Sequence, residues 1–157
     1  MFLAALGSIA FARGMHVTPV WVANAVALSF VLRAQPGRRV EILAACLVGN
    51  VAADVLTKDP LLLALALSAA NTVEVALCAG LMLRLGDPHP DLTRRRDLLV
   101  FIAAAAVSSL VSAVLASAAL GQLRGEKVWL DLLIWAMADA AGLIMVAPVL
   151  LGLPPLK

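Results

Sequence analysis

Residues 98–120 read LLVFIAAAAVSSLVSAVLASAAL, without one charged side chain. A helix rises about 1.5 Å per residue, and about 20 apolar residues are needed to cross a bilayer. The stretch therefore predicts a membrane-spanning helix. Small residues recur every four positions in it, as at Ser109, Ala113 and Ser117, a spacing that lets helix backbones approach closely in lipid. We interpret it as a central packing helix that carries no chemistry.

The rest of the chain shares this apolar character. Of its 157 residues, 63% are apolar and 14% are charged, and the mean hydropathy is +1.01. Soluble domains average about 45–50% apolar and about 25% charged residues, and so small a domain cannot bury this much apolar surface. A soluble enzyme and a disordered chain are excluded, and a net charge of +2 is too small to indicate nucleic-acid binding. The composition predicts an all-α bundle in a membrane.

The apolar stretches predict a polytopic bundle of five to six transmembrane helices, forming a single domain over residues 1–157. The expected helices cover about 1–12, 18–32, 40–57, 60–85, 98–120 and 128–153. The first is the weakest candidate, because a helix of about 12 residues rises only about 18 Å.

The basic residues predict the orientation of these helices. One side of the predicted membrane collects Arg33, Arg38, Arg39, Arg84, Arg94, Arg95, Arg96 and Lys157. The other side collects Arg13, Lys58, Arg124 and Lys127. Cytoplasmic loops carry the excess of Lys and Arg, so we expect both chain ends to be cytoplasmic in a multi-pass protein of the bacterial inner membrane.

Polar and tryptophan side chains on four predicted helices carry most of the functional information. They lie in the outer half or near the middle of the expected helices, at Trp21, Asn24, Asn50, Asp54, Asn71, Glu74, Trp135 and Asp139. Polar groups at membrane depth are costly and usually face the bundle interior. We therefore predict that these side chains line a polar pocket open to the outside. The alternative is that each one merely bonds a neighbouring helix.

Three of these residues, Asp54, Glu74 and Asp139, are acidic, and the only basic residue inside their apolar stretches is Arg84, at the cytoplasmic end. A buried carboxylate without a basic partner takes up a proton or binds a cation. We expect the three carboxyl groups to meet, either as protonated acids bonded to the nearby asparagines or around a cationic ligand.

Catalytic and metal sites are not predicted. The sequence contains no nucleophile–base pair, phosphate-binding loop or metal-ligand cluster, and Cys46 and Cys78 lie in separate apolar stretches without a redox spacing. We therefore do not expect an enzyme, and the pattern identifies no cofactor.

Several of these residues also occur in the order of a known family pattern. The pattern comprises Pro19-Val20-Trp21, Asn50, Asn71-Thr72-Val73-Glu74, Trp135 with Asp139 and Gly142, and Ala147-Pro148. From Val17 to Leu153 the chain resembles the first type of membrane-associated sensor domain, a bacterial integral-membrane input module. It departs from the family at Trp21-Val22-Ala23, where Trp-Pro-Pro is usual, and at Ala138, where Gly is usual. Family members continue into further membrane helices and an output domain, so the resemblance concerns their N-terminal half.

The resemblance implies a sensory input module that relays a signal to a cytoplasmic output domain, such as a histidine kinase or diguanylate cyclase, or to a partner protein. Its expected partners are the lipid bilayer and this output, with a homodimer or a larger membrane complex also open. Two other functions remain open: a small structural or assembly subunit of a membrane complex, and a substrate-binding transport subunit.

Overall fold

The computed structural model describes the backbone of residues 2–15, 20–86, 90–124 and 128–154, and their side chains apart from 9–15, 123, 124, 128, 129 and 131. The helices are α1 (Phe2–Met15), α2 (Val22–Arg33), the 3-10 helix η1 (Pro36–Arg38), α3 (Arg39–Leu56), α4 (Leu61–Leu85), α5 (Arg95–Arg124) and α6 (Val128–Gly152). The described residues contain no strand, which confirms the all-α prediction.

Three of these helices are long and apolar enough to cross a membrane. They are Leu61–Leu85, Arg95–Gln122 and Leu132–Gly152, and Val22–Arg33 is a shorter apolar helix. Large apolar side chains such as Leu110, Met137 and Val149 are exposed on the outer faces of the bundle. A surface of this kind is stable only against lipid or another protein, as the composition predicts for a membrane domain.

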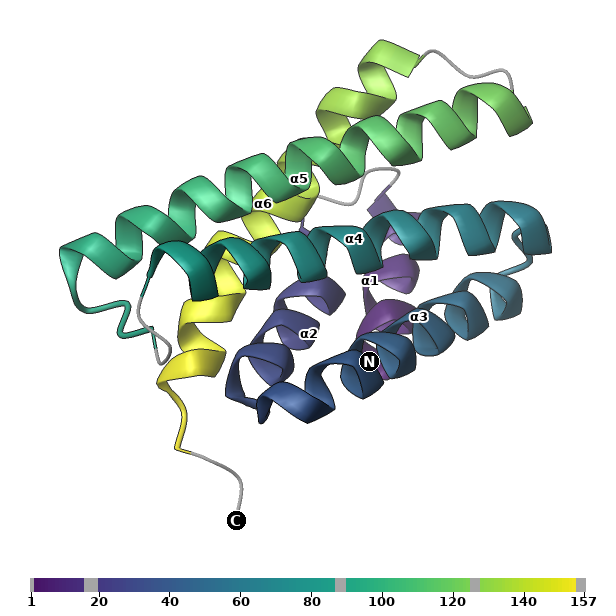
Figure 1. Ribbon diagram of the computed structural model, residues 1–157. Helices are drawn as coiled ribbons and strands as arrows, with labels where there is room; N and C mark the ends of the chain where they lie inside the picture. Colours follow the sequence, from purple (N-terminus) through teal and green to yellow (C-terminus); the bar gives the residue numbers. More distant parts are fainter. Residues whose placement is uncertain (1, 16–19, 87–89, 125–127, 155–157) are drawn as a thin grey trace.

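Helices α3 to α6 follow one another up and down the bundle (Figure 1). The hydroxyl of Ser68 on α4 bonds Asp54 near the end of α3, and Arg96 near the start of α5 bonds the carbonyl of Leu85 at the end of α4. Each such contact joins the end of one helix to the start of the next, which fixes an antiparallel order. α5 begins three residues before the expected bound, because charged residues are accommodated at a helix end, where Asp97 suits the N-terminal dipole.

Helix α2 runs parallel to α6 and contacts it at both ends (Figure 1). At the start, the backbone N–H of Trp21 donates to the carbonyl of Ala138 at 3.0 Å. This bond holds Trp21 in an extended conformation, so α2 begins at Val22 and the expected start at residue 18 is wrong. The close approach requires Gly142, because a Cβ there would lie 2.1 Å from the carbonyl oxygen of Trp21.

At the other end of α2, the guanidinium of Arg33 caps the C-terminus of α6. Its Nη2 donates to the carbonyl oxygens of Leu150 at 2.7 Å and Leu151 at 2.9 Å, and also to that of Leu153. The last carbonyls of a helix have no partner within it, and a cation there is favoured by the helix dipole. The contact ties α2 to the segment through which the chain leaves the bundle.

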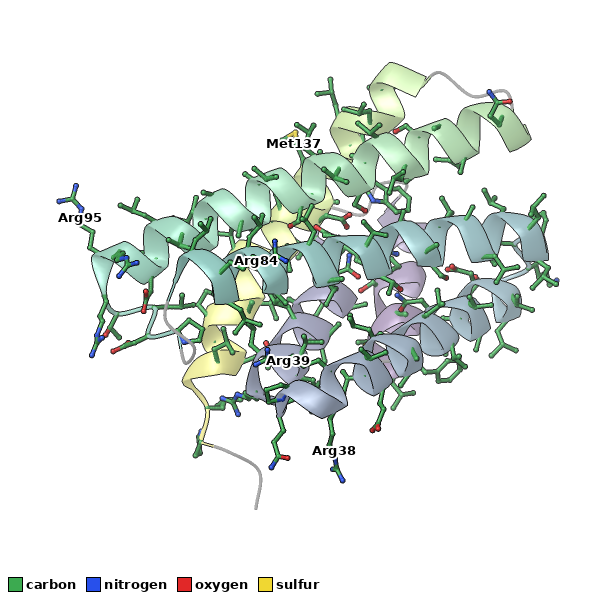
Figure 2. All side chains as sticks on the ribbon, in the orientation of Figure 1. Arg38, Arg39, Arg84, Arg95 and Met137 are labelled. Carbon is green, nitrogen blue, oxygen red and sulfur yellow. The ribbon has the colours of Figure 1, made fainter. Side chains whose placement is uncertain are left out.

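All described Arg side chains gather at this same end, which we call the Arg-rich end. They are Arg33, Arg38, Arg39, Arg84, Arg94, Arg95 and Arg96, and Figure 2 shows Arg38 and Arg95 pointing away from the helices. Lys58, in the turn between α3 and α4, lies at the opposite end. Arg13, Arg124, Lys127 and Lys157, which entered the predicted orientation, lie outside the described side chains.

Two aspartates hold the loop that precedes α5 at the Arg-rich end. The backbone N–H of Asp91 donates to Asp97 at 3.0 Å, and Asp91 pairs with Arg94 at 3.5 Å. Hydrogen bonds from the hydroxyl and then the backbone N–H of Thr93 lower the pKa of the Asp91 carboxyl. These contacts fix the turn between α4 and α5.

Helix α1 lies across the direction of α3 and α4 instead of along it (Figure 1). Its Ala5 is fully buried against Ala23 of α2 and Ala53 of α3. The first segment therefore packs onto the side of the bundle. Its sequence alone does not distinguish this packing from a shortened membrane-spanning helix.

Candidate functional site

The interior of the bundle contains a group of hydrogen-bonded polar side chains, which we call the polar cluster. Its members come from α2, α4, α5 and α6 and from the residue preceding α2: Trp21, Asn24, Asn71, Glu74, Ser109, Ser112, Trp135 and Asp139. Glu74 is fully buried, and Asp139 is 2% exposed. Side-chain hydrogen bonds of the cluster join α2 to α4, α4 to α5 and to α6, and α5 to α6.

Two carboxyl groups occupy its centre. Glu74 of α4 and Asp139 of α6 are hydrogen-bonded to each other. Oε1 of Glu74 also accepts the hydroxyl of Ser109 at 2.5 Å, and its Oε2 accepts the amide of Asn24. The structure thus joins two of the three carboxyl groups that were expected to meet.

Asn24 connects this pair to α2 and to the rest of α4. Its Nδ2 donates to Oδ1 of Asn71 at 3.0 Å as well as to Glu74, and its Oδ1 accepts the indole N–H of Trp21 at 3.2 Å. The single amide side chain therefore bonds three partners. Such an arrangement satisfies polar groups that would be costly to leave unpaired in an apolar interior.

Ser112 connects the pair to α6 on the other side. The indole N–H of Trp135 donates to Oγ of Ser112 at 3.2 Å, and that hydroxyl donates to Oδ2 of Asp139 at a long 3.5 Å. A tryptophan indole thus donates a hydrogen bond at each end of the network. Each acceptor, Asn24 or Ser112, in turn bonds one of the two carboxyl groups.

Asp54 and Asn50, also predicted for the pocket, lie outside the polar cluster. Oδ2 of Asp54 accepts the hydroxyl of Ser68 at 2.9 Å, and Ser68 lies three residues from Asn71 on the same face of α4. Asp54 is therefore about two helical turns along α4 from Glu74, and the expectation that all three carboxyl groups meet is wrong for Asp54. Oδ1 of Asn50 is buried and has no hydrogen-bond donor among the described residues.

Two serines of α5 belong to the site although the sequence assigned this helix to packing alone. Ser109 and Ser112 are both buried and bond the two carboxyl groups, so the helix supplies hydrogen-bond donors to the cluster in addition to packing against its neighbours. Serine, like alanine, is small enough to permit close helix packing. The spacing of small residues therefore does not reveal which serines also form hydrogen bonds to another helix. The available signal was that the two serines lie three residues apart on one helix face.

Among the described residues, the cluster has neither a set of metal ligands nor a basic partner. The described residues hold no group of three or more His, Cys, Asp or Glu side chains that could bind a metal ion. No hydrogen bond or ion pair joins a described Lys or Arg side chain to the cluster. Without a basic partner, the negative charge of a carboxyl pair is stabilised only by hydrogen-bond donors or removed by protonation.

Comparison with known families gives one match that covers almost the whole chain. The family MASE1, membrane-associated sensor domain 1, matches residues 1–155. Neither the curated proteins nor the solved structures contain a match to the chain.

Proposed function

This chain belongs to the MASE1 family of membrane sensory input domains, and from that premise we propose that its polar cluster is the input site. One observation carries the proposal: a single buried carboxyl pair is bonded from four helices. A ligand acts on a protein only by binding one arrangement better than another. A change at this pair alters the contacts of all four helices together, which is what an input site requires.

The relay toward the cytoplasm runs through α2 and α6. Both helices contribute to the polar cluster, and both end at the Arg-rich end, where Arg33 bonds the final carbonyls of α6. In the proposed orientation this end is cytoplasmic, because short cytoplasmic loops carry the excess of basic residues. An output domain or partner protein on that side receives the change in α6.

The proposed access to the site is from the outer side, along α3 and α4. Asp54 and Ser68 lie between the turn at Lys58 and Asn71. These groups give a polar route of about two helical turns toward Glu74. We propose that a ligand reaches the cluster by this route in a bundle of five or six membrane-crossing helices, as the outward-facing pocket predicted from the sequence requires.

The orientation can be tested by cysteine labelling in intact cells. Lys58→Cys is expected to react fully with a membrane-impermeant maleimide, because the turn between α3 and α4 faces outward. Thr93→Cys, in the exposed loop at the Arg-rich end, is expected to react only after the cells are opened. The native Cys46 and Cys78 are buried and supply a low background. The reverse labelling pattern would contradict the proposed orientation.

The sensory role can be tested by joining the chain to a diguanylate cyclase and measuring cyclic-di-GMP. Ser112→Ala removes the link between Asp139 and Trp135 and is expected to change the output about fivefold or more, the usual size of coupling between sites. Ser117→Ala is the matched control. It is the same substitution in the same helix, at a buried hydroxyl without a hydrogen-bond partner among the described residues.

Equal outputs from the Ser112→Ala and Ser117→Ala proteins would count against an input site at the cluster. Purification of the native protein with a partner in fixed ratio, together with equal outputs, would instead favour a structural subunit.

A further inference from the structure

Building on the proposed function, we propose that the ligand of the polar cluster is the proton. Glu74 and Asp139 share one proton in the described arrangement, and its loss or the gain of a second proton changes the packing of α2, α4 and α6. Two ionised carboxylates cannot bond each other, because both are acceptors only. The contact between Glu74 and Asp139 therefore requires a proton on one of them.

The other hydrogen bonds assign that proton to Asp139. Each oxygen of Glu74 already accepts a donor, the hydroxyl of Ser109 on one side and the amide of Asn24 on the other. Asp139 accepts the hydroxyl of Ser112 only at a long 3.5 Å, and it also receives a hydrogen bond from the Trp135 side chain. Because the hydroxyl bonded to Glu74 lies closer, at 2.5 Å, we assign Glu74 as the carboxylate and Asp139 as the acid that donates to it.

This arrangement is specific for one proton. A second proton on Glu74 would place an O–H against the N–H of Asn24, or would reverse the hydrogen bond with Ser109, whose hydroxyl can also accept. Loss of the shared proton would leave two like charges in contact in a medium of low dielectric constant, where their repulsion is strong. In either case the contacts of α4 with α2, α5 or α6 change.

Among the residues that the structure describes, no basic side chain bonds the pair to compensate its charge. The described groups of α2 near the pair are neutral, α5 presents serines, and α6 presents Asp139 itself. The thiol of Cys78 lies one turn from Glu74 on α4, and Asp54 of α3 is bonded to Ser68. The unpaired Oδ1 of Asn50 on α3 is a further buried acceptor. The described residues of this part of the bundle therefore have an excess of hydrogen-bond acceptors and include no cationic partner of the pair.

The two tryptophans of the network provide the measurement. The chain has three Trp and no Tyr, so a Trp129→Phe background leaves only Trp21 and Trp135, whose indoles bond Asn24 and Ser112. We expect the fluorescence of this chain in lipid nanodiscs to titrate with pH. Asp139→Asn is expected to abolish the alkaline step of the titration, which reports loss of the shared proton, because its amide donates to Glu74 as the protonated acid does but cannot lose that proton.

Asp54→Asn is the control, because it removes a buried carboxyl outside the cluster but keeps a polar side chain on the proposed access route. An equilibrium titration does not depend on the rate of access, so it should stay in place. A flat profile in the background protein, or an unchanged titration in the Asp139→Asn protein, would overturn the proposal. So would a fluorescence change on exchanging sodium for choline at constant pH, since the site would then bind a metal cation.

The titration and the output of the Ser112→Ala protein together distinguish failure of the proton proposal from failure of the proposed input site. If the titration is absent but Ser112→Ala still changes the output, the proton is not the ligand and the input site stands. If the titration is present but the output ignores Ser112→Ala, the cluster binds a proton without a sensory role.

Discussion

Gly142→Ala is expected to prevent stable folding, with a loss of about 3 kcal/mol or more in the free energy of unfolding. The new Cβ would lie 2.1 Å from the carbonyl oxygen and 2.8 Å from the carbonyl carbon of Trp21. These are backbone atoms, held in place by the 3.0 Å bond from Trp21 to Ala138, so no side chain can rotate away. The two helices would have to separate at the polar cluster. Thermal unfolding of the purified protein in detergent, followed by circular dichroism, measures the effect.

Gly80→Ala is the matched control for this substitution. A Cβ at Gly80, in the middle of α4, would meet nothing within 4 Å. Alanine in a helix interior is favoured over glycine by about 0.5–1 kcal/mol, so this variant should unfold at the same temperature or a higher one. Similar unfolding temperatures for the two variants would mean that α2 and α6 do not approach each other as described.

Asn24→Ala is expected to lower the free energy of unfolding by about 2–3 kcal/mol, the second largest effect. It removes the partner of three buried groups: the indole N–H of Trp21, Oδ1 of Asn71 and Oε2 of Glu74. Each buried polar group left unpaired costs about 1–3 kcal/mol, and relaxation of the neighbours recovers part of the sum. The same unfolding measurement applies, and the Trp21 fluorescence should change with it.

Ser29→Ala provides the comparison within the same helix. Ser29 is also buried, but its hydroxyl bonds only the carbonyl of Ala25 in its own helix, at 2.8 Å. Its loss leaves no neighbouring helix without a partner, so an effect below about 1 kcal/mol is expected. If both variants lost the same stability, Asn24 would not be the centre of a network between helices.

The sequence predicts which residues belong to the site better than it predicts how those residues are arranged. Asn24, Asn71, Glu74 and Asp139 could be identified because polar groups in apolar helices turn inward, wherever those helices pack. Which of them meet depends on the register and crossing of the helices. Asp54 shows the difference, since its position on α3 places it opposite Ser68 and away from Glu74.

Two further features were beyond the sequence pattern for physical reasons. The start of α2 is set by a backbone bond from Trp21 to a helix more than 100 residues later in the chain, which local propensity cannot indicate. The direction of α1 is set by contacts of small residues, with Ala5 buried against Ala23 and Ala53, and alanines carry little directional information. By contrast, the all-helical class follows from composition alone, because only helices satisfy the backbone within a long apolar segment.

The attachment of α2 to α6 at both extremities has a mechanical consequence. One junction is the backbone bond beside Gly142, and the other is the clasp of Arg33 on the last carbonyls of α6. Two helices joined at two points are expected to shift together. A tilt started among the carboxyl groups would therefore be carried toward the end of α6, and Pro148, inside α6 between the two junctions, is the point at which that helix can bend.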